Sequence, residues 1–223
     1  MKTILFQGDS ITDCGRLRKE PANALMNTFF KITKKSPMGS GYPDLISNEL
    51  AGQYNFVNRG VSGDRILDVY SRIVKDIIKV NPDYMSLLVG VNDIWHGFDW
   101  NNGTGIERYE KVYNILLEEL KTELPHTKIM IMEPFILEGH ATANRENQPD
   151  RFEKFKAGMN DVSEITRNLA DKYNLKFIPL QNVFDEAEKN TPAANLLSDG
   201  VHPTLLGHEL IKKEWIKAFN EIK

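Results

Sequence analysis

Residues 2–10 read KTILFQGDS, an apolar run that ends in a glycine and two polar residues. Residues 2–7 of this stretch form the first predicted run, which is short and apolar at its centre, as is typical of a strand covered on both faces of a sheet. Comparable runs occur at residues 54–60, 84–90, 128–134 and 176–181. Segments with helical periodicity separate them, and such alternation predicts right-handed β–α–β units in a parallel sheet.

Between these runs, apolar residues recur every three or four positions. The spacing predicts helices over residues 66–78, 109–120, 152–173 and 206–219, and another that begins near Tyr42. Five parallel strands with helices on both faces form a three-layer α/β/α sandwich. No linker, repeat or low-complexity tract divides the sequence, so residues 1–223 are predicted to form a single domain.

The composition excludes several classes of protein. With 28 Lys and Arg against 31 Asp and Glu, the 223-residue chain lacks the basic excess of a nucleic-acid module. Its one cysteine excludes an intramolecular disulfide and an all-cysteine metal site, and it fits a reducing compartment. No apolar run approaches the ~20 residues of a membrane span, and the N-terminal run is too short for a signal-peptide core. We therefore expect a cytoplasmic protein.

The predicted loops are unequal in length. Those after the first, third and fourth strands are long, at residues 8–42, 91–105 and 135–150, whereas residues 81–83 and 125–127 form short returns. In a parallel sheet every strand-to-helix loop leaves from the carboxyl edge. Ligands of open α/β sheets bind at that edge, so it is the predicted functional rim.

Four polar motifs are expected on or near this rim: GDS at residues 8–10, NRGVSGD at 58–64, GVND at 90–93 and SDGVHP at 198–203. The first offers a serine hydroxyl, the second backbone N–H groups beside glycines, the third a neutral amide, and the last a carboxylate and an imidazole. Taken singly, each motif is explained more simply as a turn or a helix cap.

In combination the motifs indicate acyl transfer. Ser10 supplies a nucleophile and Asn92 a donor for developing negative charge. Asp199 and His202, three residues apart on one side of a predicted helical turn, supply an orienting carboxylate and a base, and Pro203 suits the first position of the last helix. This is the minimum equipment for acyl transfer.

The order and content of these motifs resemble the SGNH/GDSL hydrolase family nearly end to end. Ser10 matches the nucleophile of its first block, here GDSI, while Gly63 and Asn92 match its second and third blocks. Asp199 and His202 match its final D-x-x-H. The resemblance implies a flavodoxin-like sandwich and the catalytic residues Ser10, Asp199 and His202. It also implies an oxyanion hole built from the N–H groups of Ser10 and Gly63 and the amide of Asn92.

The stretches GDSITDCGR, GVNDIW and DGVHPTLLGHELI are similar to intracellular acetylxylan-esterase-type members of that family. This similarity implies a serine esterase for small O-acyl groups, above all acetyl, on xylo-oligosaccharides or other carbohydrates. A thioesterase or a lysophospholipase with the same triad is the alternative. The expected partner is a small-molecule ester, and no nucleic-acid partner and no membrane span are expected. Assembly as a homo-oligomer is compatible with the resemblance. The chemistry needs neither cofactor nor metal.

Asp9, Trp95 and Trp100 are the candidate substrate-binding residues. Trp95, Phe98 and Trp100 cluster in the predicted loop after Asn92, where exposed aromatic rings could stack on a sugar. Such a cluster would also form by packing within the loop or at a subunit interface, where aromatic residues are enriched.

The remaining features are interpreted more simply. Residues 22–35 form a predicted surface helix, a lid or an oligomer contact, and Cys14 is expected to be structural. Four histidines are expected on the surface or in loops: His96, His126, His140 and His208. The competing class of protein is a flavodoxin-like binding module without hydrolytic chemistry. Residues 8–16 are too poor in glycine for a dinucleotide fingerprint and contain no phosphate-binding loop.

Overall fold

The computed structural model describes residues 1–17 and 36–223, so the predicted segment 22–35 lies outside the described residues. Five strands form one parallel sheet in the order β2-β1-β3-β4-β5. The strands are β1 (Thr3–Gly8), β2 (Asn55–Asn58), β3 (Tyr84–Leu88), β4 (Lys128–Met132) and β5 (Lys176–Ile178). Each lies within a predicted run or extends one residue past it, so the predicted five-stranded sheet is confirmed.

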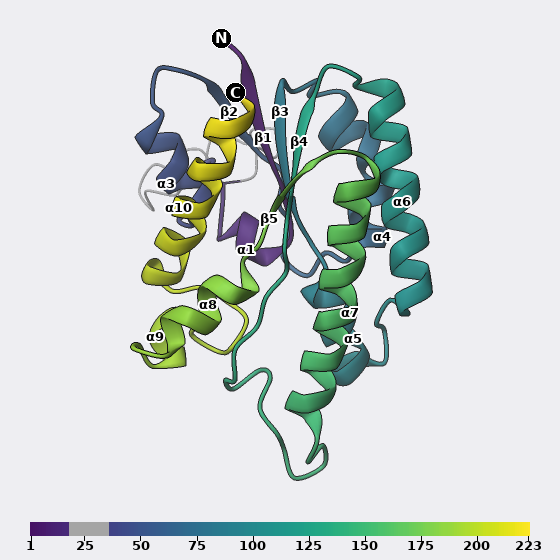
Figure 1. Cartoon of the computed structure of the whole chain (residues 1–223), viewed down its shortest axis with the longest axis vertical. Helices are drawn as coiled ribbons and strands as arrows, with labels where there is room; N and C mark the ends of the chain where they lie inside the picture. Colours follow the sequence, from purple (N-terminus) through teal and green to yellow (C-terminus); the bar gives the residue numbers. More distant parts are fainter. Residues whose placement is uncertain (18–35) are drawn as a thin grey trace, which may run out of the picture.

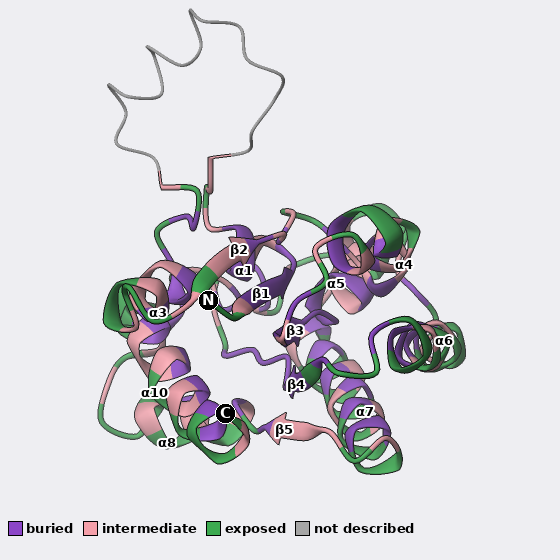
Figure 2. Ribbon diagram, turned by 90° about the horizontal axis from the view of Figure 1, so that it is seen from above, coloured by how far each residue is buried: buried purple, intermediate pink, exposed green. Residues whose placement is uncertain are grey.

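Helices cover both faces of the sheet (Figures 1 and 2). One layer holds α3 (Tyr42–Glu49), α8 (Gln181–Glu188), α9 (Ala193–Leu196) and α10 (Leu205–Ile222). The other holds α4 (Ile66–Ser71), the π-helical turn η1 (Val74–Ile78), α6 (Ile106–Glu123) and α7 (Arg151–Lys172). This arrangement confirms the three-layer α/β/α sandwich.

Two apolar cores lie on either side of the sheet. Successive side chains of a strand point to opposite faces, so Ile4 and Phe6 belong to one core and Leu5 to the other. Phe6 packs against Trp215 of α10, with ring centroids 5.5 Å apart. On the opposite face Leu5 shares its core with Val69 and other residues of α4, α6 and α7. The two cores hold the helical layers in place, and the carboxyl ends of the strands are left to carry the functional loops.

Four local predictions are wrong. The predicted loop 91–105 contains helix α5 (Val91–Trp100), and the predicted loop 8–42 contains the short helix α1 (Ser10–Asp13). The predicted helix 66–78 breaks between α4 and η1. The last helix begins at Leu205 and not at Pro203, because the side chain of Thr204 accepts a hydrogen bond from the N–H of Gly207 and caps α10. Within the described ranges, no helix combines the length and apolar character that a membrane crossing requires.

Candidate active site

Ser10 is the first residue of α1 and closely follows the carboxyl end of β1. Asp9 caps this helix, since its Oδ1 accepts a hydrogen bond from the N–H of Ile11 at 3.0 Å. Gly8 is required before it, because a Cβ there would overlap the carbonyl of Leu88 on the neighbouring strand. The turn therefore presents a partly exposed serine hydroxyl at the rim of the sheet.

The two oxygens of Asp199 have different partners in the loop between α9 and α10. Oδ1 accepts the backbone N–H groups of Val201 at 2.9 Å and of His202 at 2.8 Å. Oδ2 lies 2.7 Å from Nδ1 of the His202 ring. With Oδ2 as acceptor, Nδ1 carries the ring proton and Nε2 is left as an acceptor. The carboxylate thus fixes both the loop and the tautomer of the imidazole.

Nε2 of His202 lies 2.9 Å from Oγ of Ser10, although the two residues are 192 positions apart in the sequence. The hydrogen bond with Asp199, together with its charge, raises the pKa of His202 above its ordinary value despite partial burial. Burial opposes ionisation of Asp199, but the hydrogen bonds from the side chain and backbone of His202 and from Val201 outweigh it and lower its pKa to about 2. Hydroxyl, imidazole and ionised carboxylate therefore form one continuous chain.

Residues 137–142, after β4, pack closely against the loop that carries Asp199. The N–H of Ala141 donates to the carbonyl of Asp199 at 2.8 Å, and the N–H of Leu137 donates to that of Gly200 at 2.9 Å. A Cβ at Gly139 would lie 2.6 Å from the carbonyl oxygen of Asp199, and Gly200 has a φ of +94°. Only glycines permit this approach of the two backbones.

Gly63 lies in the turn after β2, with a φ of +85°. A Cβ added there would meet no atom within 4 Å, so the space on the Cβ side of this residue is open. The turn is fixed to α1 by Ser62, whose N–H and hydroxyl both donate to Oδ2 of Asp13, at 3.1 and 2.9 Å. This contact brings the glycine-containing turn alongside the helix of Ser10.

Asn92 is the second residue of α5 and is buried. Its Nδ2 donates to the carbonyl of Asp64 at 3.0 Å, which occupies one of its two N–H groups and fixes the direction of the other. Within the described part of the chain, neither the N–H of Ser10 nor that of Gly63 donates a hydrogen bond. The N–H groups of Ser10 and Gly63 and one N–H of Asn92 therefore have no acceptor within the described residues.

Asp9 is only 1% exposed, and its carboxylate is turned to the N-terminus of α1. Burial raises its pKa to about 7, against the opposing effects of the hydrogen bond from Ile11 and the nearby His202. The geometry shows a helix cap at this position and no surface for a substrate.

The predicted aromatic cluster lies on helix α5. The ring of Trp95 lies 5.7 Å from the His202 imidazole, centroid to centroid, and stacks on Trp100 at 6.5 Å. Trp100 is 61% exposed. Phe98 instead packs against Phe155 of α7, with ring centroids 5.4 Å apart. Two of the three aromatic residues therefore extend from the histidine to the surface.

The expectation that His208 lies on the surface or in a loop is wrong. It is 3% exposed on α10, its Nδ1 accepts the N–H of Tyr42 at 3.1 Å, and its Nε2 lies 3.5 Å from Sγ of Cys14. Burial, aided by the charge of His202, lowers the pKa of His208 to about 4. His126 and His140 are exposed, as predicted.

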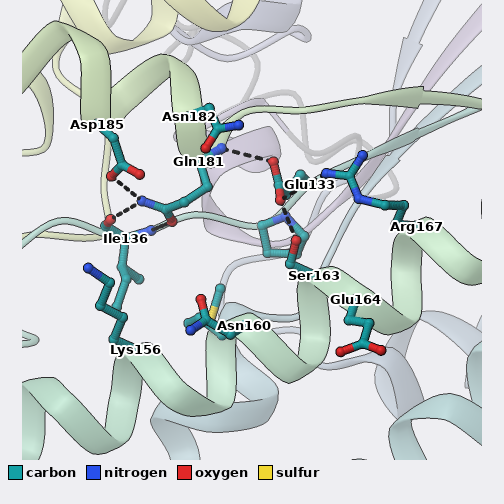
Figure 3. A pocket seen from close by; sticks show the side chains of 12 residues that line it. Glu133, Ile136, Lys156, Asn160, Ser163, Glu164, Arg167, Gln181, Asn182 and Asp185 are labelled. Atoms are coloured by element: carbon teal, nitrogen blue, oxygen red, sulfur yellow. Dashed lines mark hydrogen bonds and ion pairs between the residues drawn. The ribbon is translucent and has the colours of Figure 1, made fainter.

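A separate cavity has a volume of about 320 Å³. Its lining side chains come from α7, α8 and the segment after β4 (Figure 3). At its wall Glu133 accepts hydrogen bonds from the hydroxyl of Ser163 and from the N–H groups of Leu180 (2.8 Å) and Gln181 (3.0 Å). None of the predicted site residues lines this cavity. Among residues 1–17 and 36–223, no three His, Cys, Asp or Glu side chains are grouped so that they could hold a metal ion.

Sequence reasoning missed Asp99 and Arg151, which lie behind Trp95. The indole N–H of Trp95 donates to Oδ2 of Asp99 at 2.6 Å, and Asp99 is paired in turn with the buried Arg151. The i,i+4 spacing of Trp95 and Asp99 would have indicated the first contact had residues 91–100 been recognised as a helix. No sequence signal joins Arg151 to this group.

Comparisons with known proteins agree with this geometry. Residues 6–210 match the model of the GDSL-like lipase/acylhydrolase family. An acetylxylan esterase from Geobacillus stearothermophilus is 30% identical over 224 residues, which cover 96% of this chain and 92% of the relative.

Solved structures give the same result. A candidate GDSL-like lipase from Parabacteroides merdae has a TM-score of 0.83 at 34% identity, covering 98% of this chain and 95% of its own. The crystal structure of an acetylxylan esterase from G. stearothermophilus has a TM-score of 0.77 at 28% identity, covering 97% and 93%. The family match over most of the chain confirms the resemblance drawn from the motifs. The chain belongs to the GDSL-like lipase/acylhydrolase family and is a carboxylic ester hydrolase.

Proposed function

We propose that the chain is a serine esterase that removes small O-acyl groups, above all acetyl, from xylo-oligosaccharides or other carbohydrates through an acyl-enzyme. The observation that carries the proposal is the hydrogen-bonded series from Ser10 through His202 to Asp199, with distances of 2.9 and 2.7 Å. A free serine hydroxyl is a weak nucleophile at neutral pH, and an imidazole held in this tautomer is the group that activates it.

In the proposed reaction, Oγ of Ser10 attacks the ester carbonyl carbon while Nε2 of His202 takes the hydroxyl proton. The N–H groups of Ser10 and Gly63 and the amide of Asn92 donate to the resulting oxyanion. The bond from carbon to the alcohol oxygen then breaks, and His202 returns its proton to the leaving alcohol. A water molecule, deprotonated by His202, attacks the acyl-enzyme and releases the carboxylic acid and Ser10.

Two observations support a carbohydrate acetyl ester as substrate. The curated relative at 30% identity is an acetylxylan esterase. Trp95 and Trp100 extend from the imidazole to the surface, where aromatic faces can stack on sugar rings. We propose that these two residues contact the saccharide and that Asp9, which is buried, acts on Ser10 through the helix cap.

The acyl and alcohol specificity is tested with a panel of acetylated xylosides, other acetylated sugars, an acyl-CoA and a lysophospholipid. We expect acetylated saccharides to be hydrolysed with the highest kcat/KM. On simple activated esters, acetate should exceed octanoate, because a long acyl chain requires an apolar groove. A strong preference for octanoate would favour the thioesterase or lysophospholipase alternative. The Ser10→Ala protein corrects for background hydrolysis.

Replacing Asn92 with alanine should lower kcat on an activated acetate ester by about 10²- to 10³-fold, the loss typical of one oxyanion donor. The amide is buried and fixed by the carbonyl of Asp64, so its free N–H is already directed before substrate binds. Asn48→Ala, at an exposed position on α3, is the matched control. Wild-type kcat in the Asn92 variant would show that the oxyanion lies elsewhere.

Activity should rise with pH as His202 loses its proton, because only the neutral ring can accept the proton of Ser10. The hydrogen bond and charge of Asp199 raise the pKa of His202, so the midpoint of kcat/KM should lie above the ordinary histidine value of about 6.5. The measurement is kcat/KM from pH 5 to 9, with the pH dependence of fluorophosphonate labelling as a second readout. A flat profile between pH 5 and 8 would contradict the assignment of the base.

Two further features remain proposals that rest on the sequence, a single domain over residues 1–223 and a cytoplasmic location. Assembly as a homo-oligomer is a proposal that rests on the family resemblance alone.

A further inference from the structure

We propose that Arg151 is a positioning residue for the His202–Asp199 pair and holds it from two sides. The inference rests on the proposed function, since it concerns the same imidazole and carboxylate. It assigns a role in the reaction to a residue that does not touch the substrate or Ser10.

Arg151 begins α7 and has no exposed surface. All five of its N–H groups are used. Nε and Nη2 donate to the carbonyl of Ala141 at 3.0 and 2.7 Å, and Nη1 and Nη2 donate to the two oxygens of Asp99 at 2.8 and 3.2 Å. The remaining Nη1 donor goes to Oε1 of Gln148 at 2.6 Å. A buried guanidinium with every donor satisfied is fixed in direction by its planar fork.

Arg151 reaches the pair through two series of contacts, which we call arms. The first arm connects Arg151 through Ala141 to the loop of the Asp199 carboxylate. Ala141 accepts two hydrogen bonds from Arg151 at its carbonyl, and its N–H donates to the carbonyl of Asp199 at 2.8 Å. Ala141 is itself buried. The guanidinium therefore fixes the backbone that supports the loop of Asp199, with a single residue between the two.

The second arm runs through Asp99 to the imidazole. Asp99 receives two N–H groups of Arg151 on one side and the indole N–H of Trp95 on the other, at 2.6 Å. The indole cannot turn about its own axis without losing this bond. Its ring lies 5.7 Å from that of His202, at an interplanar angle of 55°. The indole thus lies beside the imidazole and limits how far this ring can move toward α5.

Both arms, through Ala141 and through Asp99, act on the proton transfer from Ser10 to His202, which is the step that depends most on geometry. His202 must accept from Ser10 and donate to Asp199 at the same time, and both distances are short in this structure. A displacement of about 1 Å in such a group can cost on the order of 10²-fold in rate. Because the charge of Arg151 is already neutralised by Asp99, its contribution should come from position and not from its field at Ser10.

The test compares Arg151→Lys, Trp95→Phe and the double variant, all as full-length protein. Lysine keeps the charge but loses the fork, so we expect kcat on an activated acetate ester to fall by roughly 10- to 100-fold, with little change in KM. The rate of fluorophosphonate labelling of Ser10 should fall in parallel. Because the two residues act through one arm, the loss in the double variant should be smaller than the product of the single losses.

Arg145→Lys is the matched control. Arg145 also pairs with Asp99, at 3.1 Å, but it is partly exposed, and its side chain makes no hydrogen bond to Ala141. We expect its kcat to stay near that of the wild type. Thermal unfolding and active-site titration of each variant then separate loss of folded enzyme from loss of rate per site.

The proposal is overturned if Arg151→Lys has wild-type kcat per titrated site, or if its whole loss of activity is a loss of titratable sites. Strictly multiplicative losses in the double variant would contradict the arm through Trp95. These results differ from failure of the proposed function, in which the Ser10→Ala protein would itself retain esterase activity.

Discussion

Replacing Ser10 with alanine should lower the turnover of an activated acetate ester by about 10⁴- to 10⁶-fold. The variant keeps the N–H of residue 10 and the cap from Asp9, because both involve the backbone of α1. It loses only the oxygen that lies 2.9 Å from Nε2 of His202. The residual rate comes from the oxyanion donors and from binding, which act without the nucleophile.

The loss is measured as kcat on the purified variant, together with stoichiometric fluorophosphonate labelling of the wild type and none of the variant. Ser71→Ala, at an exposed position on α4, serves as the control and should behave as wild type. If the Ser10 variant retained more than a small fraction of the activity, the nucleophile would be another group and the covalent mechanism would fail.

Replacing Asp199 with asparagine should lower turnover by about 10⁴-fold, the size of effect seen when a triad carboxylate becomes an amide. The structure gives a specific reason. Oδ1 of Asp199 accepts two backbone N–H groups, so the amide oxygen of asparagine should take this place. The amide nitrogen then faces Nδ1 of His202 and donates to it. That reverses the tautomer, and Nε2 carries a proton where it should accept one.

The Asp199 variant should therefore fold with a loop like that of the wild type and still be nearly inactive. Circular dichroism and thermal unfolding check the first point, and kcat checks the second. Asp161→Asn, on the exposed face of α7, controls for the lost charge. A variant with activity within tenfold of the wild type would mean that His202 does not depend on the carboxylate for its tautomer.

The sheet could be predicted from the sequence because each strand is a short apolar run between helical segments. Helix α5 could not, because residues 91–100 contain a glycine and three aromatic residues and follow Gly90, a pattern that also describes a loop. The segment after this helix packs closely against it, since a Cβ at Gly103 would lie 2.9 Å from the backbone of Gly97. That is a tertiary contact, which local sequence does not encode.

The polar motifs predicted which residues meet at the rim, since parallel strands deliver their carboxyl ends to one edge. The motifs could not predict the residues that hold these site residues in position. Arg151 and Asp99 are 52 positions apart and carry no shared motif. The burial of His208 depends on α10 packing against α3, which places the N–H of Tyr42 at its ring. Such contacts follow from the packing of elements that are distant in the chain.

The contact between the backbones at Gly139 and Gly200 limits how the enzyme can be redesigned. Any larger side chain at either position would push apart two segments that must stay together for the carboxylate to keep its place, so a mutant library should leave both glycines unchanged. Trp100, which is mostly exposed, is the better position to randomise when a new alcohol specificity is wanted.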